Sequence, residues 1–258
     1  MGQCHNCVAL ILGVYVFAGI PVVDGVSITH SFSASLQTPV VDAPLIISSM
    51  GQECDAGPDV DVHAMPETQW LQLLNATFNQ QPWQYGSEVA AAYAADTAVD
   101  PALAYAAINA DYSLTCGNVA IASAAKLSKF KSPIYVILNQ WHPEHTAAQR
   151  RPRWAYHSFD YAAAFEQWDD QKMVPSEQDL QFSRLMQDVF AAFIYGNFSV
   201  HNPWNIRTID SDPKFPTSAV TNVVSIESGG SIPVVNYKYE QCQMWARIGL
   251  DDRFWWIN

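Results

Sequence analysis

Two short apolar runs, separated by a long helical stretch, constrain the fold of this chain more than any other feature. "APLIISSM" at 43–50 and "SPIYVILNQW" at 132–141 are bounded by proline or polar residues and rich in aliphatic side chains. Each run therefore predicts a buried strand. The connection between them is mostly helical in pattern, and a strand, a helical crossover and a second buried strand predict a parallel sheet with covered faces.

The connection contains an alanine-rich stretch that favours helices. Asp100 followed by Pro101 is typical of a helix N-cap and first position, and we predict two helices at 86–96 and 101–112. Another helix is expected to begin at 66–67, where proline precedes glutamate.

The clearest helical pattern lies at 175–197. Ser176 is a candidate N-cap with Asp179 three residues later, and Gly196 ends the pattern. Its apolar positions recur with helical period and predict a core-facing stripe: Leu180, Phe182, Leu185, Met186, Val189, Phe190 and Phe193. After it, "AVTNVVSIES" and "IPVVNYKY" flank "GGS" and predict a pair of strands, followed by a short helix around "EQCQMWARIG".

The charges are distributed unevenly along the chain. The net charge is -12, and residues 1–125 contain 11 acidic residues but no lysine or arginine. A chain without a basic stripe cannot neutralise phosphates, which argues against nucleic-acid binding. The acidic surface favours solubility, or alternatively the attraction of a cationic substrate.

The N-terminal segment is apolar but matches no standard signal. "CVALILGVYVFAGI" at 7–20 is short for a membrane span. It also lacks the preceding lysine or arginine that is typical of a signal peptide. We interpret it as a buried strand, or as a start that differs from the natural one. Cys4 and Cys7 form a C-x-x-C without a second pair, so no zinc site is predicted there.

Two N-glycosylation sequons are present, at Asn75 and Asn197. Chance sequons are common in a chain of this length, so they favour a secreted or extracellular protein only slightly.

Glu53 and His157 are the residues best placed for chemistry. Each follows one of the two predicted strands, and ligands and catalytic groups gather at the carboxyl ends of parallel strands. Taken alone, however, His157 is more typical of a structural histidine and Glu53 of a surface acid. His142 and His145, in "HPEH", are expected to be solvent-exposed loop residues rather than a metal pair, because Pro143 disfavours helical spacing.

Five segments in order resemble the type-B carboxylesterases and cholinesterases. They are "PVVDG" (21–25), "PLIISSMGQEC" (44–54), "WAYHSFDYAAAF" (154–165), "FSRLMQDVFAAFIYGN" (182–197) and "CQMW" (242–245). The resemblance implies a partial α/β-hydrolase fold, in which the C-terminal strands of a mostly parallel sheet are covered by helices. This C-terminal part of a carboxylesterase domain would occupy 18–258, after an atypical apolar segment at 1–17.

The resemblance also implies roles for individual residues. It places Glu53 on the acid and His157 on the histidine of a Ser-Glu-His triad, and Asp160 on the acidic residue that follows three positions later. It further implies a disulfide between Cys116 and Cys242. The family's reaction, hydrolysis of a small carboxylic ester through an acyl-serine intermediate, requires no metal or organic cofactor.

This sequence departs from the family pattern at the site itself. Gln52 and Cys54 replace the aspartate and glycine around the acid, and Ser158 replaces the glycine after the histidine. Losing these glycines is expected to tighten the backbone. A larger departure is the absence of any G-x-S-x-G, so the chain has the acid and base of a triad but not its serine or oxyanion loop.

The leading hypothesis is therefore a carboxylesterase-like chain that is inactive without its nucleophile-bearing half. The alternative is a non-catalytic cholinesterase-like module for adhesion or partner binding. A third hypothesis is that a separate polypeptide supplies the nucleophile, which would make that polypeptide a protein partner.

Overall fold

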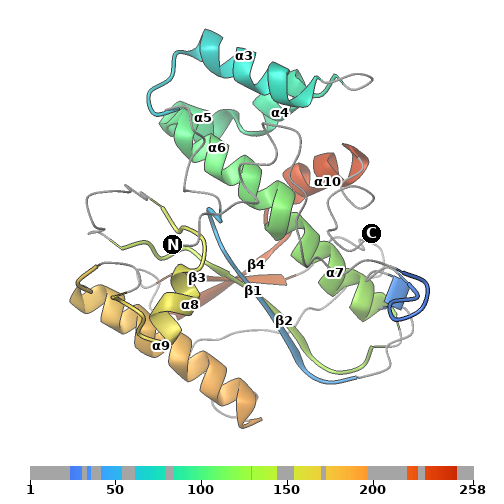
Figure 1. Ribbon diagram of the computed structural model, residues 1–258, viewed down its shortest axis with the longest axis vertical. Coiled ribbons are helices and arrows are strands. Elements are labelled where there is room, and N and C mark those ends of the chain that lie inside the picture. Colours follow the sequence, from blue (N-terminus) through green and yellow to red (C-terminus); the bar gives the residue numbers. More distant parts are fainter. Residues whose placement is uncertain are drawn as a thin grey trace.

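The computed structural model describes residues 24–30, 34–35, 42–53, 62–79, 84–128, 130–143, 154–169, 173–196, 220–225 and 230–248 (Figure 1). Several sequence predictions lie outside these residues: the apolar segment at 1–17, Cys4, Cys7, Cys54, His145 and Asn197.

The centre of the molecule is a four-stranded sheet of order β1-β2-β3-β4. Its strands are β1 (Leu45–Met50), β2 (Ile134–Asn139), β3 (Val220–Ser225) and β4 (Gly230–Val235). β1, β2 and β3 run parallel to one another, and β4 returns antiparallel to β3. The predicted parallel pairing of the two apolar runs is confirmed, with Leu45 opposite Ile134 and Met50 opposite Asn139.

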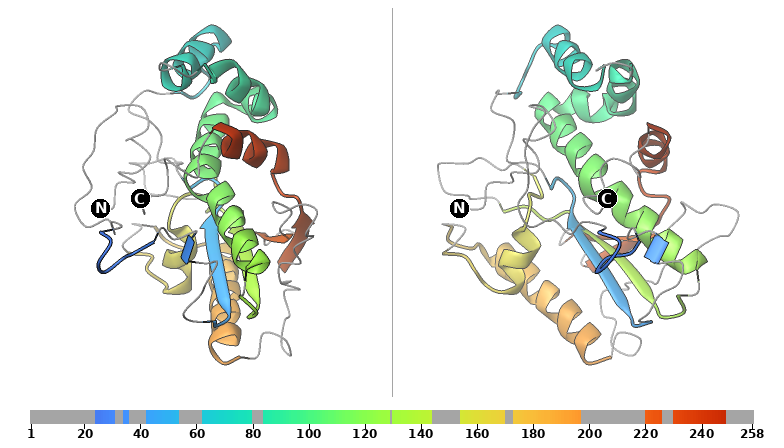
Figure 2. Two further views of the ribbon diagram at one scale, coloured as in Figure 1. Left: turned by 90° about the vertical axis from the view of Figure 1, so that its right-hand side faces the viewer. Right: turned by 45° about the vertical axis from the view of Figure 1, so that its right-hand side comes forward.

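Helices cover both faces of the sheet, as the two faces of strand β2 show. Ile134 and Val136 pack with residues of helix α7 (Cys116–Leu127), whereas the alternate residues Tyr135 and Ile137 pack with residues of α9 (Glu177–Ile194). Because successive side chains of a strand point to opposite faces, the sheet lies between α7 and α9 (Figure 2).

The crossover from β1 to β2 is helical, as predicted, but its helix boundaries differ from the expected ones. Its elements are α3 (Glu67–Phe78), α4 (Gly86–Ala92), α5 (Ala94–Val99), α6 (Pro101–Ala110), the π-helical turn η1 (Asp111–Thr115) and α7. The helix predicted at 86–96 is interrupted at Tyr93, whose backbone leaves helical geometry (φ -115°, ψ 21°). The helix predicted at 101–112 instead continues through η1 into α7. No proline interrupts it, and the residues on either side of η1 keep right-handed helical dihedral angles.

Two helix starts follow the sequence signals closely. The carboxylate of Asp100 accepts a hydrogen bond of 2.8 Å from the Ala102 amide, with Pro101 at the first helical position. In α9 the hydroxyl of Ser176 and the carboxylate of Asp179 form a reciprocal capping box. Both caps satisfy amide groups that have no partner within the helix.

The remaining helices are α8 (Phe159–Ala164), which packs against α9, and the terminal helix α10 (Tyr239–Ile248). The Cys116–Cys242 disulfide joins α10 to the start of α7, as the family resemblance implied, and spans 126 positions of the chain. It closes a long loop and ties the C-terminal region to the helical layer.

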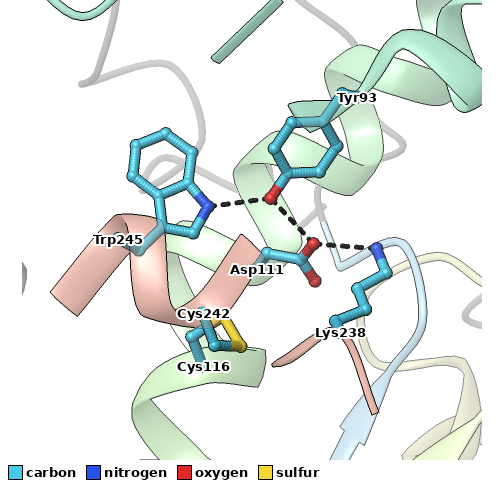
Figure 3. Close-up of a disulfide and its surroundings, with 6 residues drawn as sticks. All are labelled: Tyr93, Asp111, Cys116, Lys238, Cys242 and Trp245. Atoms are coloured by element: carbon cyan, nitrogen blue, oxygen red, sulfur yellow. Dashed lines mark hydrogen bonds and ion pairs between the residues drawn. A yellow bond between two sulfur atoms is a disulfide. The ribbon is translucent and has the colours of Figure 1, made fainter. Parts of the chain in front are cut away.

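A buried polar network surrounds this disulfide (Figure 3). One carboxylate oxygen of Asp111 accepts hydrogen bonds from the Tyr93 hydroxyl and the Lys238 ammonium group, both at 2.8 Å. The indole of Trp245 donates to the same tyrosine hydroxyl at 2.7 Å. The network thus links α10 and the turn before it to the interruption at Tyr93 and to η1.

Candidate active site

The carboxyl ends of β1 and β2 bring the predicted acid and histidine together. Glu53 follows β1 after a short turn in which the Gly51 amide donates to the Asn139 carbonyl at 2.8 Å. His157 lies in the loop between β2 and α8. The two segments meet at an isolated parallel bridge between Gln52 and Tyr156.

Glu53 and His157 are in direct contact. The Nδ1 atom of His157 lies 2.5 Å from Oε2 of Glu53, whose other oxygen, Oε1, accepts a hydrogen bond of 2.6 Å from the Met50 amide. The glutamate side chain is 7% exposed, whereas the histidine side chain is 50% exposed. The structure therefore holds a buried carboxylate behind an imidazole that solvent can reach.

This geometry fixes the tautomer of the imidazole. An ionised carboxylate can only accept hydrogen bonds, so Nδ1 of His157 donates and Nε2 of the neutral ring carries the free lone pair. The hydrogen bond with Glu53 raises the pKa of His157 above its ordinary value, although burial of part of the ring opposes the change. The pair can therefore take a proton at Nε2 and stabilise the resulting imidazolium.

Asp160, three residues after the histidine, interacts electrostatically with both members of this pair. Its Oδ2 atom accepts hydrogen bonds of 3.0 Å from the Ser48 hydroxyl and the Asn139 side-chain amide, and Oδ1 accepts from the Tyr161 amide. Burial raises the pKa of Asp160, and the charge of Glu53 raises it further. The negative charge of Asp160 in turn contributes to the raised pKa of His157.

Sequence reasoning missed Ser48 and Asn139 as members of this site. Asn139 is fully buried and donates to both Ser48 and Asp160, at 3.0 Å in each case. Their positions in the sequence could have indicated them, because each is a polar residue within or at the end of an apolar strand. A polar side chain buried there needs a hydrogen-bonding partner.

Ser158 adopts a backbone conformation that favours glycine. Its φ of 66° and ψ of 9° lie in the left-handed region, which costs a residue with a Cβ atom about 1 kcal/mol or more. This strained residue lies directly after His157, and the expected backbone tightening stays a prediction.

The other predicted sites make different contacts. His142 is exposed and stacks on Trp141, with ring centroids 6.1 Å apart. Asn75 is exposed on α3 and accepts a hydrogen bond from Asn79, so its glycosylation stays a prediction. Among the described residues, no three His, Cys, Asp or Glu side chains gather as a metal site. Within the same residues, no helix is long and apolar enough to cross a bilayer.

Comparison with solved structures identifies the fold. A structure named "thermophylic PNB esterase" matches with a TM-score of 0.54 and 17% identity over 83% of this chain. The chain has the fold of the matching part of this esterase. Two structures named "PNB esterase" match with TM-scores of 0.52 and 0.53, each at 18% identity. Each match covers 40% of the esterase chain, so this sequence spans well under half the length of these neighbours.

This fold is of the α/β-hydrolase kind, with the carboxyl ends of its parallel strands holding the candidate pair. A scan against protein-family models found no match, and a search of curated proteins found none. The roles of individual residues therefore rest on the geometry of this site.

Proposed function

We propose that this chain supplies the acid and the base of a serine-type carboxylic ester hydrolase. One observation carries the proposal: a buried Glu53 bonded to Nδ1 of a half-exposed His157 at the carboxyl ends of two parallel strands. The shared fold with esterases supports the reaction class. No G-x-S-x-G occurs in the sequence, so the serine and the oxyanion donors come from another polypeptide segment.

The chemistry follows from the free lone pair on Nε2. In the first half-reaction, Nε2 of His157 takes the proton of a serine hydroxyl as its oxygen attacks the ester carbonyl, and Glu53 stabilises the imidazolium. The imidazolium then gives that proton to the departing alcohol, which leaves an acyl-serine. In the second half-reaction, His157 activates water in the same way, and the acid and free serine are regenerated.

The test is a fusion that supplies the missing part. The N-terminal segment of a PNB esterase, ending where the structural match begins, would be fused to this chain and assayed with p-nitrophenyl esters. We expect turnover by the fusion and none by the 258-residue chain alone. Glu53→Gln should lower kcat by about 10⁴-fold and His157→Ala by about 10⁶-fold, as the loss of the acid and of the base of a triad do.

His142→Ala is the matched control, because this exposed histidine stacks on Trp141. It should leave turnover unchanged. Ester turnover by the fusion that survives both His157→Ala and Glu53→Gln would contradict the proposal.

A further inference from the structure

Gln52 attaches the loop that contains His157 to the loop that contains Glu53 by two hydrogen bonds. The Gln52 amide donates to the Ala155 carbonyl at 2.9 Å, and the Ala155 amide donates to Oε1 of the Gln52 side chain at 3.0 Å. Gln52 therefore satisfies both backbone polar groups of Ala155, one with its main chain and one with its side chain. Glu53 is the next residue along the chain, and His157 lies two positions after Ala155.

The side chain of His157 does not have enough packing to fix its own position. It is half exposed, it lies outside regular secondary structure, and the strained backbone of Ser158 follows it directly. The orientation of the ring therefore depends on how the backbone at 155–158 is held. Ala155 is fully buried, so an amide there that lost its acceptor would have no water to replace it.

We propose that Gln52 is a positioning residue whose side-chain amide holds the His157 loop within hydrogen-bonding reach of Glu53. Reach and charge both favour glutamine at this position. A side chain one methylene shorter would leave the Ala155 amide unpaired. A neutral acceptor adds no third negative charge beside the carboxylates of Glu53 and Asp160, which already interact with each other.

The catalytic consequence of this positioning rests on the proposed function, but the positioning itself is measurable without an ester. Two NMR readouts on the full chain report it. Hydrogen exchange at the Ala155 amide reports the Gln52 contact, and a histidine titration, with His157→Ala to assign the resonance among the seven histidines, reports the Glu53 contact.

We expect Gln52→Ala and Gln52→Asn to speed exchange at the Ala155 amide by about fivefold or more, the loss of one hydrogen bond. Both should also lower the pKa of His157 toward the ordinary value of 6.5, because the hydrogen bond that Nδ1 donates to Glu53 is the largest effect that raises it. Gln52→Glu keeps the length and the acceptor, so it should retain slow exchange at Ala155, and its added negative charge by itself favours a raised His157 pKa. The exposed Gln181 on α9 provides the control, and Gln181→Ala should change neither readout.

Wild-type exchange at Ala155 or a wild-type His157 pKa in Gln52→Ala would each overturn the proposal, as would fast exchange at Ala155 in Gln52→Glu. Should Gln52→Ala fail to fold by circular dichroism, the comparison of Gln52→Asn with Gln52→Glu decides by the same readouts. Failure of the esterase fusion would overturn the proposed function and leave these readouts untouched. Conversely, an unchanged His157 pKa would overturn the role of Gln52 and leave the function standing.

Discussion

Glu53 and Asp111 are both buried carboxylates with a nitrogen partner, but their surroundings differ. Glu53 contacts His157, whose side chain is 50% exposed, in a loop outside regular secondary structure. Asp111 contacts Lys238, whose side chain is 18% exposed, beside a disulfide and two buried aromatic residues. One pair leaves a nitrogen accessible to a reactant, whereas the other is enclosed.

The enclosed pair is suited to fixing the position of α10. Burial raises the pKa of Asp111, and Lys238 and Tyr93 offset part of that effect. Burial is the largest effect and lowers the pKa of Lys238, but the charges of Asp111 and Tyr237 and the hydrogen bond to Asp111 together outweigh it, so the pKa is raised. We therefore expect the region around Asp111 to determine stability and the region around His157 to determine chemistry.

Removal of the disulfide should have the largest effect on stability. Cys116→Ala with Cys242→Ala opens a loop spanning 126 positions, and the loss of loop-closure entropy predicts a fall of about 5 kcal/mol in the free energy of unfolding. Urea denaturation of the double variant, and of the wild-type chain with and without a reductant, measures this fall in the free energy of unfolding. The His157 pKa should stay raised in the double variant, and a fall toward 6.5 would show that the two regions are not independent.

Asp111→Ala should have the next largest effect. It leaves the Lys238 ammonium group buried without its partner, which costs about 3–5 kcal/mol of unfolding free energy. Glu177→Ala is the matched control, because it breaks the exposed pair with Arg184, and it should cost less than about 1 kcal/mol. Equal losses in the two variants would contradict the distinction between enclosed and exposed pairs.

Asp111→Leu combined with Lys238→Met sharpens the same comparison. With both charges removed, much of the loss should be recovered, because the main cost of the single change is an unpaired buried charge.

The two regions also differed in how far the sequence predicted them. The parallel strands were predictable because apolar runs and proline boundaries are local signals, and the caps of α6 and α9 were predictable for the same reason. The Glu53–His157 contact joins residues 104 positions apart, which no local pattern encodes. It was anticipated from strand ends and from the family resemblance.

The Asp111 network was not anticipated at all. An aspartate within an alanine-rich helical stretch is typical of a solvent-exposed helix face. Asp111, however, begins a π-helical turn and is almost fully buried. The sequence marks Gln52 only as a departure from a family pattern. The contact that its side chain makes with Ala155 is tertiary, and no local pattern encodes it.

Ser158→Gly should have a smaller effect and the opposite sign. The left-handed backbone at this position favours glycine, so we expect a gain of about 1 kcal/mol in the free energy of unfolding. Ser87→Gly is the control, since this exposed serine lies in helix α4, where glycine should cost about 0.5–1 kcal/mol. A loss of stability in both variants would show that the strain at Ser158 is relieved elsewhere.

The smallest effect is the pH dependence of the Glu53–His157 pair, measured as the difference in unfolding free energy between the wild-type chain and Glu53→Gln. The His157 pKa is raised in the folded state, so the folded state binds its proton more tightly than the unfolded state does. The stabilisation is therefore complete below about pH 6.5 and is lost as the pH rises through the folded-state pKa above it.

Lys238 provides the contrast in the same titration. Its pKa is raised above 10.5, so the difference between the wild-type chain and Lys238→Met should stay constant between about pH 7 and 9, where it remains charged. The contribution of the Glu53–His157 pair should decline as the pH rises through the folded-state pKa of His157. If that contribution stayed constant through neutral pH, the imidazole would not exchange its proton there and could not act as a general base, because a base must gain and lose a proton near the working pH.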